Sequence, residues 1–116
     1  MFTSVVERLR RAVPNASILV IGPPDRYYRV KRRYWKPLDG VDRIIEAQRD
    51  ACRQAGCAFW DQRARMGGYG SMRQWVYAGW AQGDHTHFTA GGYSALAAAL
   101  YSDMIRQYEL FKTQGG

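Results

Sequence analysis

The chain has 116 residues, the size of a single globular domain, and 47% of them are hydrophobic, which excludes a disordered or low-complexity protein. Its longest apolar run, Ala95 to Tyr101, is much shorter than the roughly 18 to 20 residues that span a bilayer, so no transmembrane helix is expected. The first residues lack a basic segment followed by an apolar one, and no secretory signal is visible.

The net charge of +7 is concentrated in one segment. Cations that neutralise phosphates, interleaved with aromatic rings that stack on bases, are typical of sites that bind anionic polymers. The alternative is a solvated loop whose arginines lie across neighbouring aromatic rings, as in many proteins that never meet nucleic acid. Residues 26–36 contain no acid and six cations, namely Arg26, Arg29, Lys31, Arg32, Arg33 and Lys36, together with Tyr27, Tyr28, Tyr34 and Trp35.

Helical and strand-like patterns alternate in the first part of the chain. Ser4 and Glu7 have the spacing of a capping box, and apolar residues recur at helical spacing until Pro14. Residues 16–21 form a nearly continuous apolar run that ends at a Gly-Pro-Pro sequence. This run predicts a strand buried on both faces, as in a parallel sheet.

The same alternation continues after the basic segment. Asp39 is expected to cap a helix that Gly56 ends, and residues 57–61 predict a second short strand. About twenty residues of glycine-containing loop follow, in which Ser71 is expected to cap one short helix. Thr89 is expected to cap the long final helix.

This order predicts an α/β protein with a parallel sheet. Two strands offer little apolar area to three main helices, and both edges of such a sheet would be open. We therefore expect the chain to pair with a further segment, to self-associate through a strand edge, or to have been cut from a longer protein. A tight, stable monomer in solution would count against this expectation.

Asp84 and His87 lie just before the last predicted helix, where α/β proteins place reactive groups. Their spacing can bring a carboxylate to one imidazole nitrogen, which leaves the other nitrogen free to take a proton from a hydroxyl nucleophile. Acids are common enough that this spacing also arises by chance, and Asp84 could merely orient the loop. The surrounding residues decide how the pair is interpreted.

These surroundings resemble the closing block of the SGNH, or GDSL-type, esterase and acylhydrolase family, in which an Asp-x-x-His element precedes the final helix. Residues 84–93 follow that form closely. Residues 59–61 and 66–71 are similar to the branch related to peptidoglycan O-acetylesterases, and residues 18–25 resemble the family's fourth strand with its exit loop. The resemblance covers essentially the whole chain.

The resemblance implies the C-terminal part of a three-layer α/β/α, flavodoxin-like fold with parallel strands, so that residues 1–116 are expected to form a single partial SGNH hydrolase domain. It implies that His87 is the general base and Asp84 its orienting partner. The family's nucleophilic serine stands in a Gly-Asp-Ser motif, and its oxyanion hole draws on a Gly-x-Asn-Asp motif. Neither motif occurs in this sequence, so the first three strands and the nucleophile are expected to be absent.

The glycine loop supplies the remaining site candidates, with Gly67, Gly68 and Ser71 as substrate-binding residues. Neither Ser71 nor Ser94 has the Gly-x-Ser-x-Gly elbow that exposes a strained nucleophile. We expect Ser71 to cap a helix and Ser94 to lie on the solvent side of one. The loop also lacks the Lys-Ser/Thr ending of a nucleotide-binding loop, so a phosphate site is not expected.

No metal and no cofactor are expected. Asp84, His85 and His87 could suit zinc, but no further anchored ligand is evident. The two cysteines, Cys52 and Cys57, are too few for a disulfide framework and wrongly spaced for a Cys-x-x-Cys motif. They are interpreted as buried or incidental thiols.

The leading hypothesis is the C-terminal portion of a serine esterase that removes acyl groups, with O-acetyl groups of a carbohydrate as the expected case. Its partners would be an acylated carbohydrate or small ester, and a missing N-terminal segment or a second copy; neither nucleic acid nor a membrane is expected. Alone, the chain should be nearly inactive because loss of a triad nucleophile removes most of the rate.

Two alternatives remain at this stage. One is an inactive module that binds an anionic polymer through residues 26–36, and its binding should weaken steeply with salt. The other is a truncated gene product without activity of its own. Esterases of the resembling branch are often periplasmic or attached to the cell envelope, but the sequence leaves the compartment of this chain unknown.

Overall fold

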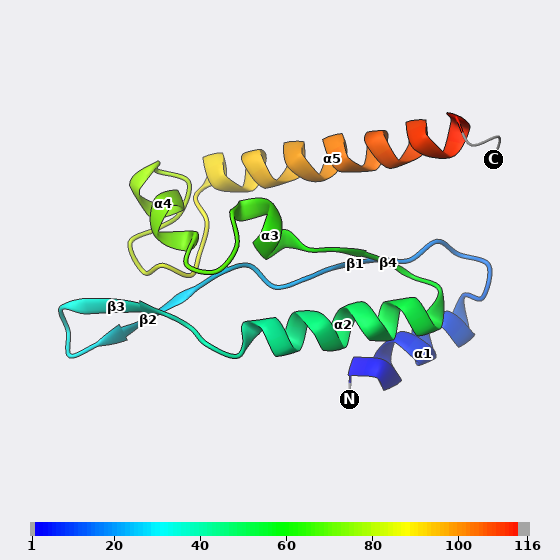
Figure 1. Ribbon diagram of the computed structural model, residues 1–116, viewed down its shortest axis with the longest axis horizontal. Coiled ribbons are helices and arrows are strands. Elements are labelled where there is room, and N and C mark those ends of the chain that lie inside the picture. Colours follow the sequence, from blue (N-terminus) through cyan, green and yellow to red (C-terminus); the bar gives the residue numbers. More distant parts are fainter. Residues whose placement is uncertain (1, 114–116) are drawn as a thin grey trace.

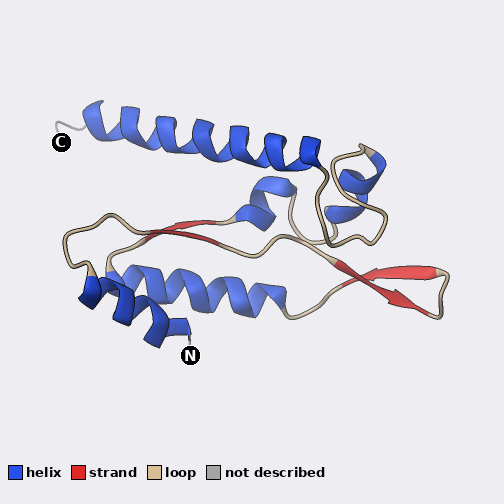
Figure 2. Ribbon diagram, turned by 180° about the vertical axis from the view of Figure 1, so that it is seen from behind, coloured by secondary structure: helices blue, strands red, loops and turns tan. Residues whose placement is uncertain are grey.

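The computed structural model describes residues 2–113 and, for side chains, residues 4–113. The chain forms three layers (Figures 1 and 2). The helices α1 (Phe2–Ala12) and α2 (Val41–Ala55) lie on one side of a short strand pair, and α5 (Ala90–Thr113) runs along the other side. This arrangement confirms the predicted α/β class and its α/β/α layering.

The central layer consists of β1 (Leu19–Ile21) and β4 (Ala58–Trp60), which pair in parallel with Leu19 opposite Ala58. The parallel direction agrees with the prediction, but the expected burial of β1 on both faces is wrong. Leu19 and Ile21 are both exposed. Because β4 is the only described strand that pairs with β1, and α5 leaves part of β1 uncovered, these apolar side chains have no second layer to bury them.

The basic segment forms a β-hairpin and not the loop that its sequence predicts. β2 (Tyr27–Val30) and β3 (Tyr34–Pro37) pair antiparallel and project from the end of the molecule (Figure 1). The three residues between them include Lys31 and Arg32 with φ angles of 48° and 62°. Two cationic residues thus adopt a left-handed backbone conformation that glycine adopts more easily. Because no glycine marks this turn, the sequence does not predict it.

The helix ends follow the expected chemistry at two of five positions, Gly56 and Thr89. Gly56 ends α2 in a left-handed conformation and donates its amide to the Cys52 carbonyl. The Thr89 hydroxyl accepts the Gly92 amide at the start of α5. Gly40, not Asp39, precedes α2, and α1 begins before the predicted box at Ser4.

The glycine-containing loop holds two short helices. The first, α3 (Gln62–Met66), was not expected; the Asp61 carboxylate caps it by accepting the Ala64 amide. The second, α4 (Met72–Tyr77), was predicted and follows Ser71 directly. The Ser71 side chain makes no capping hydrogen bond, so the expected capping role of its hydroxyl is wrong.

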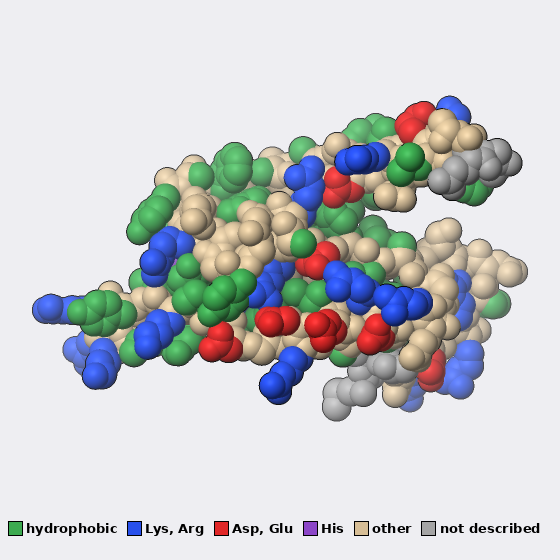
Figure 3. Space-filling view, viewed as in Figure 1, with side chains coloured by type: hydrophobic (Ala, Val, Ile, Leu, Met, Phe, Trp, Pro, Cys, Tyr) green, Lys and Arg blue, Asp and Glu red, His purple; other side chains and the backbone are tan. Residues whose placement is uncertain are grey.

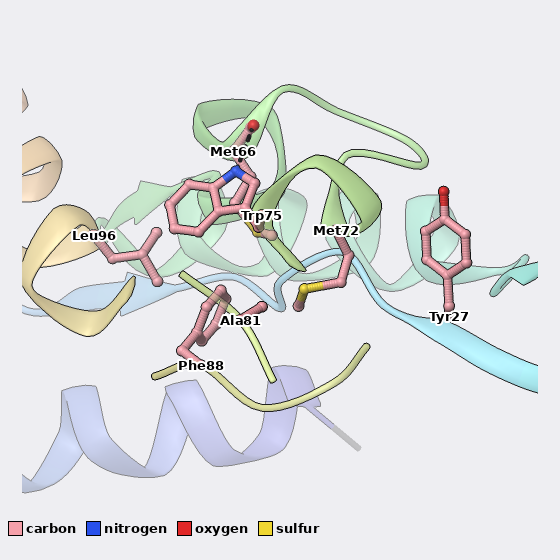
Figure 4. Packing of buried hydrophobic residues seen from close by; sticks show 7 residues of the cluster. All are labelled: Tyr27, Met66, Met72, Trp75, Ala81, Phe88 and Leu96. Atoms are coloured by element: carbon pink, nitrogen blue, oxygen red, sulfur yellow. Dashed lines mark hydrogen bonds between the residues drawn. The ribbon is translucent and has the colours of Figure 1, made fainter. Parts of the chain in front are cut away.

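The main hydrophobic core lies beneath this loop, where α3, α4, the start of α5 and the base of the hairpin meet (Figure 4). Trp75 lies at its centre and donates its indole N–H to the Met66 carbonyl at 3.0 Å. A smaller buried group lies between α1 and α2 and includes the free thiol Cys52, whose pKa is raised by burial. The main core consists of Tyr27, Met66, Met72, Trp75, Ala81, Phe88 and Leu96.

Candidate active site

The loop that carries Asp84 and His87 is closed at its base by buried residues. Ala81 and Phe88 form an antiparallel bridge, and both side chains belong to the main core. Within the loop, the Gln82 amide donates to the His87 carbonyl at 2.8 Å. The six residues between Ala81 and Phe88 therefore form one compact turn that is anchored to the main core. A catalytic group needs such a rigid support to stay in position.

Asp84 and His87 meet within this turn. The His87 Nδ1 atom lies 2.5 Å from Asp84 Oδ2, while Asp84 Oδ1 accepts the backbone amides of Thr86 and His87 at 3.0 Å each. The carboxylate is thus fixed by two amides on one oxygen and presents the other oxygen to the ring. The predicted spacing of three residues brings these two side chains together as expected.

The electrostatics of the pair define the state of the imidazole. The hydrogen bond from His87, followed by the backbone amide of the same residue, lowers the pKa of Asp84 to about 2. Above that pH Asp84 is an acceptor only, so Nδ1 must carry the hydrogen in the neutral ring. Nε2 then holds a free lone pair, and the His87 side chain is 66% exposed. This is the tautomer that a general base needs.

The carboxyl of Asp84 should titrate well below its ordinary value. We expect carbon-detected NMR to find its pKa near 2, and the variant His87→Ala to raise this pKa toward 3.8 because the ring hydrogen bond is lost. Since the folded pKa is depressed, the stabilisation is present above about pH 3.8 and is lost as the pH falls toward 2. An unchanged titration in His87→Ala would contradict the assigned contact.

His85, between the two partners, points away from them. Its side chain is buried, with 7% of the residue exposed, and its ring stacks on Trp35 with centroids 4.3 Å apart and planes 20° apart. The backbone of His85 is left-handed, with φ at 57°, and its Nδ1 lies 2.8 Å from the Gly83 carbonyl oxygen. His85 therefore anchors the turn to the hairpin and does not join Asp84 and His87 in one cluster.

Tyr27 connects the same turn to the glycine loop. Its amide donates to the His85 carbonyl at 3.1 Å, and its hydroxyl donates to the Gly70 carbonyl at 2.7 Å. Asp25, two residues earlier, is fully buried and accepts the amides of Gly70 and Met72 at 3.2 and 2.9 Å. The segment after β1 thus fixes the position of the glycine loop relative to the turn that carries Asp84 and His87.

The predicted substrate-binding residues lie in the glycine loop and are not brought into contact with His87. Gly67 and Gly68 have φ angles of 129° and 93°, which favour glycine. A Cβ atom on Gly67 would lie 3.2 Å from Ser71 Cβ, so the loop is tightly folded there. Ser71 is buried and its hydroxyl has no partner among the described residues. A shallow cavity of about 250 Å³ adjoins these residues.

The residues that support the site were largely missed from sequence. Asp25 follows two prolines and carries no motif, and Tyr27 and Trp35 belong to a basic segment whose sequence fits either a polyanion-binding site or a solvated loop. The aromatic and β-branched residues of segments 27–30 and 34–35, separated by three residues, were the available signal for a hairpin. The pairing of that hairpin with His85 joins segments about fifty residues apart and has no local signature.

Across residues 2–113, His, Cys, Asp and Glu side chains form no group of three that is suited to a metal ion. None of the helices described has the length and apolar character that crossing a membrane requires.

Comparison with known proteins identifies the class of fold. No protein-family model matches the chain, and no curated protein matches it. A solved structure of a peptidoglycan O-acetylesterase is similar, with a TM-score of 0.81 and 30% sequence identity over 91% of this chain. The esterase domain of the ORF1 protein from the zebrafish retrotransposon ZfL2-1 shares the fold, with a TM-score of 0.62 and 22% identity over 91% of this chain.

These structures confirm the resemblance to the C-terminal portion of SGNH-type esterases. The chain spans only 30% of the length of the first solved chain and 55% of the second. The α/β/α layers with their parallel strands therefore correspond to a part of that fold.

Proposed function

We propose that residues 1–116 are a partial domain that supplies the Asp–His half of a Ser-His-Asp esterase site, acting on O-acetyl esters of a carbohydrate. One observation carries this proposal: His87 Nδ1 lies 2.5 Å from the fixed Asp84 carboxylate, and the His87 side chain is exposed to an incoming group. The similarity to a peptidoglycan O-acetylesterase supports the ester and carbohydrate classes.

In the proposed reaction, Nε2 of His87 takes the proton of a serine hydroxyl as the serine oxygen attacks the ester carbonyl. Asp84 stabilises the imidazolium that forms, since its low pKa keeps it ionised. The imidazolium then returns the proton to the departing sugar alcohol. Water repeats the sequence on the acyl-serine and releases the carboxylic acid, with His87 again as the base.

The proposed nucleophile lies outside this chain. Ser71 is buried, and Ser94 is an exposed residue of α5. We propose that a further segment, carrying the serine and the oxyanion donors, docks beside β1. The apolar side chains of this segment would bind in a groove of about 470 Å³ between α5 and the β1–β4 pair. Figure 3 shows this groove as a hollow. The apolar lining of this groove includes Leu19, Phe59, Trp60, Leu100 and Met104.

Fragment complementation tests this proposal. The complement is the part of the solved peptidoglycan O-acetylesterase that this chain does not match, and the readout is acetate released from an O-acetylated sugar. We expect little turnover from either fragment alone and clear turnover from the mixture. Turnover by the chain alone would show that a local nucleophile exists and that the partial-domain proposal is wrong.

The alternative of an inactive module that binds an anionic polymer through residues 26–36 makes a different prediction. It requires salt-sensitive binding without any turnover in the mixture. The hairpin, however, contacts the loop of Asp84 and His87 through His85, so binding there and hydrolysis at His87 are compatible.

A further inference from the structure

The solvent face of the hairpin carries aromatic and cationic side chains together. Cross-strand partners share a face, so Tyr28 with Lys36 and Val30 with Tyr34 form one side of the β2–β3 pair. Side chains of this face are exposed to solvent at Tyr28, Tyr34 and Lys36, and the exposed fraction of Tyr34 is 63%. The opposite side carries Tyr27 and Trp35, which pack against the body of the protein. Two open tyrosine rings flanked by a cation thus face outward.

The tip of the hairpin adds three consecutive cations, Lys31, Arg32 and Arg33. Arg29 fixes the tip by donating two N–H groups to the Arg32 carbonyl, at 2.9 and 2.6 Å, while its guanidinium lies over the Trp35 ring. The tip is therefore held in its left-handed backbone conformation by contacts within the hairpin. Such a preorganised cluster binds anions with a smaller loss of conformational entropy.

No opposing charge neutralises the hairpin. Within residues 4–113, none of its five cations, nor Arg26 just before it, forms an ion pair with a carboxylate. The acids Asp42, Glu46 and Asp50 lie on α2 instead, and Figure 3 shows acidic side chains gathered in the middle of the molecule, apart from the basic end. The resulting positive field extends from the hairpin into solvent and would attract a polyanion.

The inner side of the same hairpin touches the candidate active site. Trp35 stacks on His85, and Tyr27 donates its amide to the His85 carbonyl, so the hairpin and the turn of Asp84 and His87 form one connected unit. The outward face with Tyr28 and Tyr34 is therefore the opposite side of the same two strands that contact the turn of the proposed base.

We propose that the β2–β3 hairpin is the binding arm for an acidic polysaccharide, whose anionic groups pair with Lys31, Arg32 and Arg33 and whose sugar rings lie on Tyr28 and Tyr34. This inference rests on the proposed function, because it assigns the charge class of the substrate presented to His87. Single-stranded nucleic acid is bound by similar combinations of cations and aromatic rings. It carries no acyl ester for an Asp–His pair to act on, and the connection to that pair therefore favours the polysaccharide.

Binding to the chain alone tests the arm without any need for hydrolysis. The probe is a decasaccharide of polygalacturonate, titrated at two salt concentrations and followed by tyrosine and tryptophan fluorescence. We expect binding that weakens with salt and is reduced on the order of tenfold by Arg32→Gln/Arg33→Gln, with a shallower salt dependence. Tyr34→Ala should weaken binding without changing the salt dependence, since it removes a stacking surface and no charge.

The matched control is Arg8→Gln/Arg11→Gln, which removes two exposed cations from α1 and lowers the net charge by the same amount. It should leave the affinity within about twofold, because α1 lies away from the hairpin (Figure 1). Equal weakening by both double variants would overturn the proposal, since only the overall charge would then matter.

Two further probes separate the possible ligands. A neutral dextran of equal length should not bind. Oligodeoxythymidylate of equal charge should bind more weakly than polygalacturonate, and tighter binding of the oligonucleotide would overturn the assignment to a polysaccharide. If the decasaccharide fails to bind while the complemented mixture still hydrolyses O-acetyl sugar through His87, the arm is wrong and the proposed function stands. Binding without turnover in any mixture would instead remove the proposed function and favour the inactive module.

Discussion

Replacing His87 by alanine is expected to lower ester hydrolysis by the complemented chain by about four to six orders of magnitude. The substitution removes the imidazole that the Asp84 carboxylate orients, and with it the acceptor for the serine proton. Because the His87 side chain is exposed and outside the main core, the fold should be unaffected. Acetate release at saturating substrate, measured beside the circular dichroism spectrum, separates lost chemistry from lost structure.

Ser94→Ala is the matched control for this experiment. Ser94 is exposed near the start of α5 and is the accessible serine that lies nearest to His87 in the sequence. We expect its variant to keep the full rate, because the proposed nucleophile lies on the complementary segment. A mixture whose rate survives His87→Ala within about tenfold would contradict the role of His87, and loss of rate in Ser94→Ala would identify a nucleophile within this chain.

Replacing Asp25 by alanine is expected to lower the free energy of unfolding by about 3 to 5 kcal/mol. Asp25 is fully buried, and its two oxygens accept the amides of Gly70 and Met72. Alanine would leave these amides without acceptors. It would also remove a carboxylate oxygen that lies 3.4 Å from Nε of the buried Arg63; this ion pair lacks the alignment of a hydrogen bond.

Urea denaturation followed by tryptophan fluorescence measures this effect, with Asp42→Asn as the control. Asp42 pairs with the same Arg63 from the surface, and the hydrogen bond from Arg63 lowers the pKa of this exposed carboxyl. Asp42 is exposed, and the buried Arg63 keeps Asp25 as its second partner, so Asp42→Asn should change the midpoint much less than Asp25→Ala does. If Asp25→Ala does not fold, Asp25→Asn retains one acceptor and should show a smaller loss. Similar midpoints for the two positions would contradict the buried role of Asp25.

The elements with a local chemical cause could be predicted from sequence. The helix at Val41–Ala55 and its stop at Gly56 follow from apolar spacing and a glycine in the left-handed conformation. The parallel pair follows from short apolar runs on either side of that helix. The burial of β1 could not be predicted, because burial depends on what lies against the strand and not on the strand's own residues.

The candidate site divides in the same way. Asp84 and His87 are three residues apart, so the turn alone brings them together, and the sequence was sufficient to predict their contact. Asp25 and Tyr27 act on residues about forty-five and sixty positions later through backbone amides and carbonyls, which any sequence provides. Only the three-dimensional structure shows the role of Asp25 and Tyr27. The position of His85 against Trp35 likewise depends on the hairpin, which could not be predicted from the sequence.

One titration tests most directly the central claim that this chain supplies the base half of an esterase site. A fixed amount of the complementary esterase portion is mixed with increasing amounts of the chain, and acetate release and light-scattering mass are recorded together. We expect activity to rise from near zero and to saturate at one chain per complement, as a one-to-one complex forms. Activity from the chain alone, or a one-to-one complex without activity, would contradict it.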